Sequence, residues 1–179
     1  MLSPAGRLPV TFYKSLEQLP AFEDYSMARR TYRYFAGDPL YPFGYGLSYT
    51  QFEYRRPRVS RESISADDSV TVSADVVNRG GMASDEVVQL YLTHPGFAGA
   101  PLRELQGFKR IHLAPGQSQS VAFTLRDRDL SVVDADGKRQ IATGQVRAWI
   151  GGGQPSAGTS QVAGVSTEFQ ITSAKVLPN

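Results

Sequence analysis

Residues 32–54 read YRYFAGDPLYPFGYGLSYTQFEY, a run that places nine aromatic side chains among turn-forming residues. These nine are half of the 18 tyrosines and phenylalanines in the protein. Each large ring carries on the order of 150–250 Å² of surface that folding can bury, so the run cannot stay in water. Prolines at positions 39 and 42 and glycines at 44 and 46 exclude a long helix and favour tight turns. The stretch is therefore predicted to be a folded connector with ring-lined walls.

The aromatic run has two interpretations. In the first, the rings pack an N-terminal segment against the rest of the chain. In the second, some of them stack on a ligand such as a sugar. Packing is favoured because aromatic clusters are more often core than binding platform, although both interpretations stay open. The candidate residues for packing or sugar stacking are Tyr32, Arg33, Tyr34, Tyr41, Phe43, Tyr45 and Tyr49, and Trp149 is a further ring for a sugar platform.

The composition narrows the class of protein. The chain has 179 residues, of which 41% are hydrophobic and 20% charged, as in ordinary soluble globular proteins. No window is long and apolar enough for a spanning helix, so no membrane partner is expected. A net charge of +2, carried by scattered lysines and arginines, favours no nucleic-acid partner. The absence of cysteine excludes disulfides and thiolate sites, and the first residues do not form a signal peptide.

Two units are expected along the chain. Residues 1–50 contain a strand-like run at 7–13 and one helical turn ending at Pro20, and they are too short to fold alone. From residue 51 onward, short alternating runs separated by turn residues predict an immunoglobulin-like or fibronectin type III-like antiparallel β-sandwich of about seven strands. These runs are expected at 69–78, 86–93, 104–113, 120–125, 130–134, 139–142, 144–150 and 165–171, with a loop at 151–164.

No catalytic or metal site is visible in the sequence. His94 and His112 have no acidic pair at helical ligand spacing, so we interpret each as a loop or strand-surface histidine. Glycoside hydrolysis needs two carboxylates, but every candidate pair is adjacent to a turn and is best explained as solvated charge. These candidates are Asp67 with Asp68, Asp85 with Glu86, and Asp127 with Asp129. No cofactor is expected.

Several motifs, in the same order as in this chain, resemble glycoside hydrolase family 3. Residues 6–12, GRLPVTF, and 39–50, PLYPFGYGLSYT, resemble the end of that family's second domain. Four further motifs resemble the fibronectin type III-like domain that follows it. They are NRG at 78–80, EVVQLYL at 86–92, PLRELQGFK at 101–109 and LAPGQ at 113–117. The form RTYRYF at 30–35 is more similar to the β-xylosidase and α-arabinofuranosidase branch than to β-glucosidases.

The resemblance implies a function for the chain. Residues 1–50 would be an irregular remnant of the α/β sandwich domain with its aromatic connector, and residues 51–179 the β-sandwich domain. The family's nucleophile and acid/base lie in segments that this chain does not match, so no catalytic residue is carried over. The parent protein would be a retaining β-xylosidase or β-glucosidase that acts on plant polysaccharide, periplasmic or secreted, and this chain its accessory, stabilising C-terminal end. Its partners would be the enzyme's N-terminal barrel and α/β domains.

Two alternatives to this accessory function stay open. The chain could be a carbohydrate-binding module that anchors the enzyme on plant cell-wall polysaccharide. It could also be a stand-alone protein that pairs with a separate catalytic chain.

Overall fold

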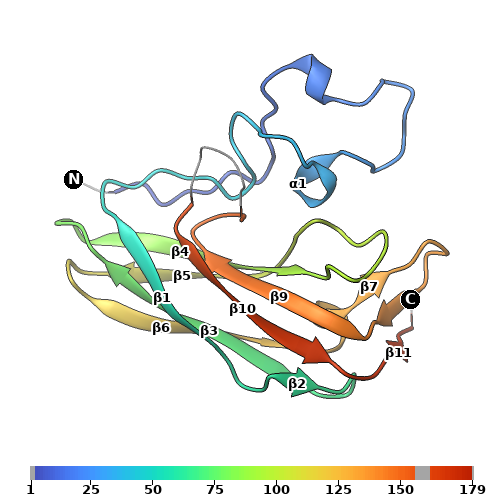
Figure 1. The fold of residues 1–179 in the computed structure, drawn as a ribbon. Coiled ribbons are helices and arrows are strands. Elements are labelled where there is room, and N and C mark those ends of the chain that lie inside the picture. Colours follow the sequence, from blue (N-terminus) through green and yellow to red (C-terminus); the bar gives the residue numbers. More distant parts are fainter. Residues whose placement is uncertain (1–2, 156–161, 179) are drawn as a thin grey trace.

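The computed structural model describes residues 3–155 and 162–178, which fold into a β-sandwich covered on one side by the N-terminal segment, residues 3–50 (Figure 1). Three sheets are present in the described residues. The first has the strand order β1-β3-β6, the second β2-β10-β9-β4-β5 and the third, a small one, β11-β8-β7. Within these residues, no helix has the length and apolar character needed to cross a membrane.

The strands of the first sheet are β1 (Phe52–Val59), β3 (Val70–Asn78) and β6 (Ser118–Leu125). The second sheet contains β2 (Ser63–Ile64), β4 (Ser84–Thr93), β5 (Glu104–Leu113), β9 (Gly144–Gly151) and β10 (Gly164–Ile171). The third contains β7 (Val132–Val133), β8 (Arg139–Ile141) and β11 (Lys175–Val176). The helical turns are η1 (Leu16–Gln18), α1 (Thr31–Tyr34) and η2 (Asp127–Leu130).

The core lies between the first two sheets, and alternation in the sequence builds it. Val70, Val72, Ala74 and Val76 of β3 are fully buried, as their spacing predicts for one face of a strand. From the other sheet, Val88, Leu90 and Leu92 of β4 and Val146, Ala148 and Ile150 of β9 enter the same cluster. The predicted antiparallel β-sandwich is confirmed, and seven strands of eight or more residues carry it.

The strand predictions need two corrections. Residues 7–13 do not form a strand; only Phe12 makes an isolated bridge, to Tyr41, because Pro9 and the turns opposite it interrupt pairing. The partner of this stretch is the aromatic run itself, since Leu8 N donates to Tyr45 O and Gly44 N donates to Leu8 O, both at 2.8 Å. One long strand, β1, was not assigned from the sequence. Part of the loop predicted at 151–164, residues 156–161, lies outside the described residues.

The outer face of the five-stranded sheet is not exposed to water where the N-terminal segment lies on it. Gln89 and Tyr91 of β4 point away from the core, yet they are only 3% and 1% exposed. Figure 1 shows the reason, because the segment runs across this side of the sandwich and places α1 above it. The candidate residues of the aromatic run therefore lie at the contact between the segment and the sheet, or on the segment's far side.

Candidate functional site

The contact between the N-terminal segment and the sandwich contains a buried ion pair. Arg7 Nη2 lies 2.6 Å from Glu86 Oε2. The other carboxylate oxygen of Glu86 accepts a hydrogen bond of 2.7 Å from the Tyr54 hydroxyl, and Arg7 Nε donates to Gly152 O at 2.9 Å. Burial raises the pKa of the Glu86 carboxyl, while Arg7, Tyr54 and the Val87 amide oppose that shift. Both carboxylate oxygens are thus occupied, so Glu86 holds the segment in place rather than offering an acid to a substrate.

A second polar contact fixes the aromatic run on β4. Gln89 Nε2 donates to Gly44 O and to Gly152 O, each at 3.1 Å, and Gln89 Oε1 accepts from the Tyr91 hydroxyl at 2.6 Å. Gly44 has a left-handed φ of +76°, and a Cβ at this position would overlap Gln89 Oε1. Only glycine fits both the backbone and the space. Gly44 therefore allows the segment to lie close to the sheet.

Tyr32 anchors the connector through both its ring and its hydroxyl. Its ring stacks on Phe43 with centroids 4.1 Å apart and meets Tyr91 edge-on at 6.1 Å. The Tyr32 hydroxyl accepts from Leu105 N at 3.2 Å, and Arg103 Nη1 donates to Tyr32 O at 3.1 Å. Phe43 covers one face of the Tyr32 ring, so the geometry of these two rings is that of packing.

The other candidate residues lie nearer to solvent. Arg33 forms a 2.8 Å ion pair with Glu104, and Tyr34 is half-buried. Tyr45 is also half-buried, whereas Tyr41 and Tyr49 are exposed. Trp149 is half-buried, and its Nε1 donates to Gly153 O at 3.1 Å. The structure thus brings Tyr32 and Phe43 together, places Tyr41 beside Tyr45 with centroids 5.2 Å apart, and leaves Tyr49 apart from both pairs.

Tyr41 and Tyr45 line a groove of about 550 Å³ whose lining residues all belong to the segment. Phe12 meets Tyr41 edge-on at 6.2 Å, and Leu8 and Leu47 complete the apolar wall. Arg7 is the one charged residue in the lining, and its donors already bind Glu86, Gly6 and Gly152. Such a surface suits apolar side chains of a protein better than a sugar, which needs hydrogen-bonding groups around its hydroxyls.

Exposed apolar side chains are concentrated in the N-terminal segment. Of the 15 large hydrophobic residues exposed in the described chain, 11 lie between residues 10 and 49. They are Val10, Phe12, Leu16, Leu19, Phe22, Tyr25, Met27, Leu40, Tyr41, Leu47 and Tyr49. Exposed apolar side chains gathered in one segment in this way indicate an interaction site. The segment therefore has two faces, one bound to the sandwich and one uncovered.

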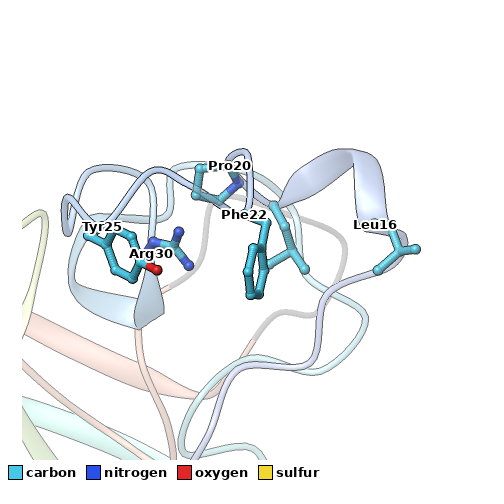
Figure 2. Close-up of a pocket in the computed structure, with 6 residues that line it drawn as sticks. Leu16, Pro20, Phe22, Tyr25 and Arg30 are labelled. Carbon is cyan, nitrogen blue, oxygen red and sulfur yellow. The ribbon is translucent and has the colours of Figure 1, made fainter.

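A second concavity lies in residues 14–30, which we call the arm. It is an open hollow of about 590 Å³, lined by Leu16, Leu19, Pro20, Phe22, Tyr25 and Arg30 (Figure 2). Phe22 and Tyr25 were not among the sequence candidates, because PAFEDY at residues 20–25 shows no helical or strand period. The available signal was an aromatic residue between a proline and acidic residues, at a position that no helix or strand pattern would bury.

The candidate carboxylate pairs are separated by the fold. Asp85 and Glu86 are neighbours on β4 and so point to opposite faces; Asp85 pairs with Arg110 and His112 outside, whereas Glu86 points inward. The His112 and Arg110 side chains lower the pKa of Asp85. Asp67 pairs with Lys175, Asp68 with Arg61, and Asp129 accepts from Arg126 N at 3.1 Å. None of these pairs forms two free carboxylates facing one cleft.

His94 lies in the loop that follows β4, which is one of the two expected places, but its side chain is buried there. Only 8% of its surface is exposed, and burial lowers its pKa from 6.5 to about 4. Its Nε2 makes no hydrogen bond within the described part of the chain. No group of three or more His, Asp or Glu side chains that could hold a metal ion occurs among those residues.

Residues 1–49 match the glycosyl hydrolase family 3 C-terminal domain, and residues 86–154 match the fibronectin type III-like domain. A β-xylosidase of Formosa agariphila is 35% identical over 84% of this chain and 22% of its own length. A xylan 1,4-β-xylosidase of Xylanibacter ruminicola is 42% identical over 75% of this chain and 15% of its own length.

A solved structure is similar to this chain over nearly its whole length. The structure of β-glucosidase 3B from Thermotoga neapolitana in complex with α-D-glucose matches 99% of this chain and 26% of its own, with a TM-score of 0.83 and 28% sequence identity. The match includes the N-terminal segment as well as the sandwich. This chain spans about a fifth of the length of the curated relatives that it matches.

Proposed function

Because the chain belongs to glycoside hydrolase family 3, in which it corresponds to the C-terminal region of β-glucosidases and β-xylosidases, we propose that it is an accessory part of such an enzyme and is not catalytic alone. In this role the sandwich supports the N-terminal segment, and the segment binds the enzyme's barrel and α/β domains. The parent enzyme would act on β-linked xylosides or glucosides of plant polysaccharide, in the periplasm or outside the cell.

The observation that carries the proposal is the uncovered apolar face of the segment. Outside the arm, six of the 15 exposed large hydrophobic residues lie in the part that matches the family's C-terminal domain, namely Val10, Phe12, Leu40, Tyr41, Leu47 and Tyr49. A surface of that composition is stable in water only when it is covered. The remainder of a family 3 enzyme is the partner that the relatives' greater length suggests.

The polar contacts supply the second part of the argument. Arg7 with Glu86 and Gln89 with Gly44 connect the segment to the sandwich through hydrogen bonds of buried or partly buried side chains. These contacts fix the orientation of the surface that a neighbouring domain would contact. Polysaccharide binding by the candidate rings themselves gains less support, because Tyr32, Phe43 and Trp149 are engaged in packing.

The test is hydrolysis of aryl β-xyloside and aryl β-glucoside. The chain alone should show no turnover, and turnover should appear when it is mixed with a family 3 polypeptide that carries the barrel and the upstream α/β part. Phe12→Asp, in the apolar groove, should prevent that recovery, whereas Phe108→Asp, an equal charge change on the exposed face of β5, should not. Turnover by the purified chain alone would refute the proposal.

A further inference from the structure

The arm, residues 14–30, presents the most exposed apolar side chains of the described chain. Phe22 and Tyr25 are each 88% exposed and Leu16 is 84% exposed, more than any other large hydrophobic residue described. The arm is separate from the groove at Phe12 and Tyr41, with which it shares no lining residue. It stands away from the sheets at the far end of the segment (Figure 1).

The arm is held in shape by its own hydrogen bonds. Arg30 Nε donates to Ser26 O at 3.1 Å, and Arg30 Nη2 donates to the carbonyl oxygens of Asp24 and Ala21. Asp24 Oδ1 accepts from Ser26 N at 2.9 Å. At the base of the arm, Gln18 Nε2 donates to Asp38 O at 3.1 Å. The backbone that carries the exposed rings is therefore shaped before any partner covers them, which reduces the ordering cost of binding.

The backbone on both sides of Arg30 is held in a costly conformation. Arg29 and Thr31 have left-handed φ values of 60° and 56°, which are unusual for residues with a Cβ and most so for a β-branched one. The Arg30 contacts, together with the 3.0 Å hydrogen bond from Thr31 N to the Tyr13 hydroxyl, maintain it. The position of the guanidinium is thus fixed by the surrounding structure.

The chemistry of the arm pocket differs from that of the apolar groove. Figure 2 shows the Arg30 guanidinium between the rings of Tyr25 and Phe22. Within the described residues Arg30 Nη1 makes no hydrogen bond, so its N–H groups remain available. The pocket of about 590 Å³ is within the size range of small-molecule sites, which combine apolar walls with a few placed polar groups.

We propose that the arm pocket binds a sugar unit of a β-linked glycoside. The C–H faces of the pyranose would lie against Phe22 and Tyr25, and Arg30 Nη1 would donate to a hydroxyl. The apolar faces of aromatic rings suit the C–H faces of a sugar, and the planar, always charged guanidinium suits its hydroxyl groups. The choice of β-xylosides and β-glucosides as the sugar class rests on the proposed function, whereas the pocket itself rests on the arm alone.

Electrophoresis of the complete chain in gels containing soluble xylan or β-glucan tests this site. The wild-type chain should be retarded, and each of Phe22→Ala and Tyr25→Ala should weaken retention about tenfold. Neither change alters the net charge, and neither ring is buried, so mobility in plain gels and thermal stability should stay at the wild-type level. Phe108→Ala, at a ring that is 67% exposed on β5, is the matched control and should bind like wild type.

A titration with xylohexaose and cellohexaose, followed by amide NMR shifts, locates the contact. Shifts confined to residues 14–30 support the site; no shift with either sugar, or unchanged retention of the Phe22→Ala/Tyr25→Ala double variant, refutes it. If the double variant instead loses only the recovery of hydrolysis on mixing with the rest of a family 3 enzyme, the arm contacts protein. That result would refute the sugar site and leave the proposed function standing.

Discussion

Arg7 and Glu86 form an ion pair across the contact between the N-terminal segment and the sandwich, with 2.6 Å between Nη2 and Oε2 and side chains that are only 12% and 4% exposed. Two charges taken out of water are tolerated when their remaining hydrogen-bonding capacity is satisfied. Here the Tyr54 hydroxyl and Gly152 O complete the network. This network fixes where the segment lies on the sandwich.

Removing one partner of this pair should be strongly destabilising. Arg7→Ala leaves a buried carboxylate without its counter-charge, and we expect the free energy of unfolding in urea at pH 7 to fall by about 3–5 kcal/mol. The double variant Arg7→Ala/Glu86→Gln should recover part of this loss. Arg110→Ala, which breaks the exposed pair with Asp85, is the control and should cost less than about 1 kcal/mol. Equal losses for Arg7→Ala and Arg110→Ala would contradict the role given to the buried pair.

Two glycines with the same backbone angle should respond differently to alanine. Gly44 has φ +76° and its Cβ position is filled by Gln89 and by the Tyr91 hydroxyl, which would lie 2.9 Å away. Gly116 has φ +75° and open space around it. Gly116→Ala should cost about 1–2 kcal/mol for the left-handed backbone alone. Gly44→Ala should cost at least about 3 kcal/mol, because it also displaces the Gln89 hydrogen bonds. Thermal unfolding of both variants measures the difference, and similar costs would show that the contact with Gln89 yields readily.

His94 should make stability depend on pH. Burial lowers its pKa from 6.5 to about 4, so the unfolded chain takes up this proton before the folded chain does. The contribution of the neutral ring is therefore complete above about pH 6.5 and is lost as the pH falls towards 4, by up to about 3 kcal/mol. Between pH 7 and pH 4, the free energy of unfolding measured in urea should fall less for His94→Gln than for wild type. Parallel pH profiles for the two proteins would contradict the shift.

The sandwich could be predicted wherever one strand face is uniformly apolar. Val70, Val72, Ala74 and Val76 alternate without interruption, and β3 follows their pattern. The hairpin around Asp136 and Gly137 was likewise signalled by its turn residues, and β7 pairs β8 there. Strand β1 was not assigned because FEYRRPRV contains Pro57 and three arginines; a bulge between Arg55 and Arg58, with Arg56 at φ 49°, absorbs them.

The site was harder to predict than the sandwich. The sequence indicated that residues 32–54 must be covered, but not by what, because Arg7 and Glu86 lie 79 positions apart and neither has a local signal. The arm was missed for a different reason. Its exposed rings follow no period, since Arg30 and not a regular element holds them.

Asn78 provides the last prediction, because its side-chain amide uses both its donor and its acceptor sides. Its Nδ2 donates to Met82 O at 2.8 Å and to Leu113 O at 3.0 Å, while its Oδ1 accepts from Thr50 Oγ1 and from Gly80 N. Asn78→Asp keeps the shape but turns an oxygen towards two carbonyl groups in a fully buried place. We expect a loss of about 2–4 kcal/mol at pH 7.

The same substitution should respond to acid in a direction that its environment dictates. An ionised carboxyl facing two carbonyl oxygens is disfavoured, so the folded pKa of Asp at this position would be raised above its unfolded value. The deficit relative to wild type should then shrink as the pH falls from 7 to 4, because the protonated carboxyl can donate to one of the two carbonyls. Gln119→Glu, an amide-to-acid change on the exposed side of β6, is the control and should change stability by less than about 0.5 kcal/mol at pH 7. If Asn78→Asp were as stable as wild type at both pH values, the turn at residues 78–80 would not depend on the amide donors that join it to Met82 and Leu113.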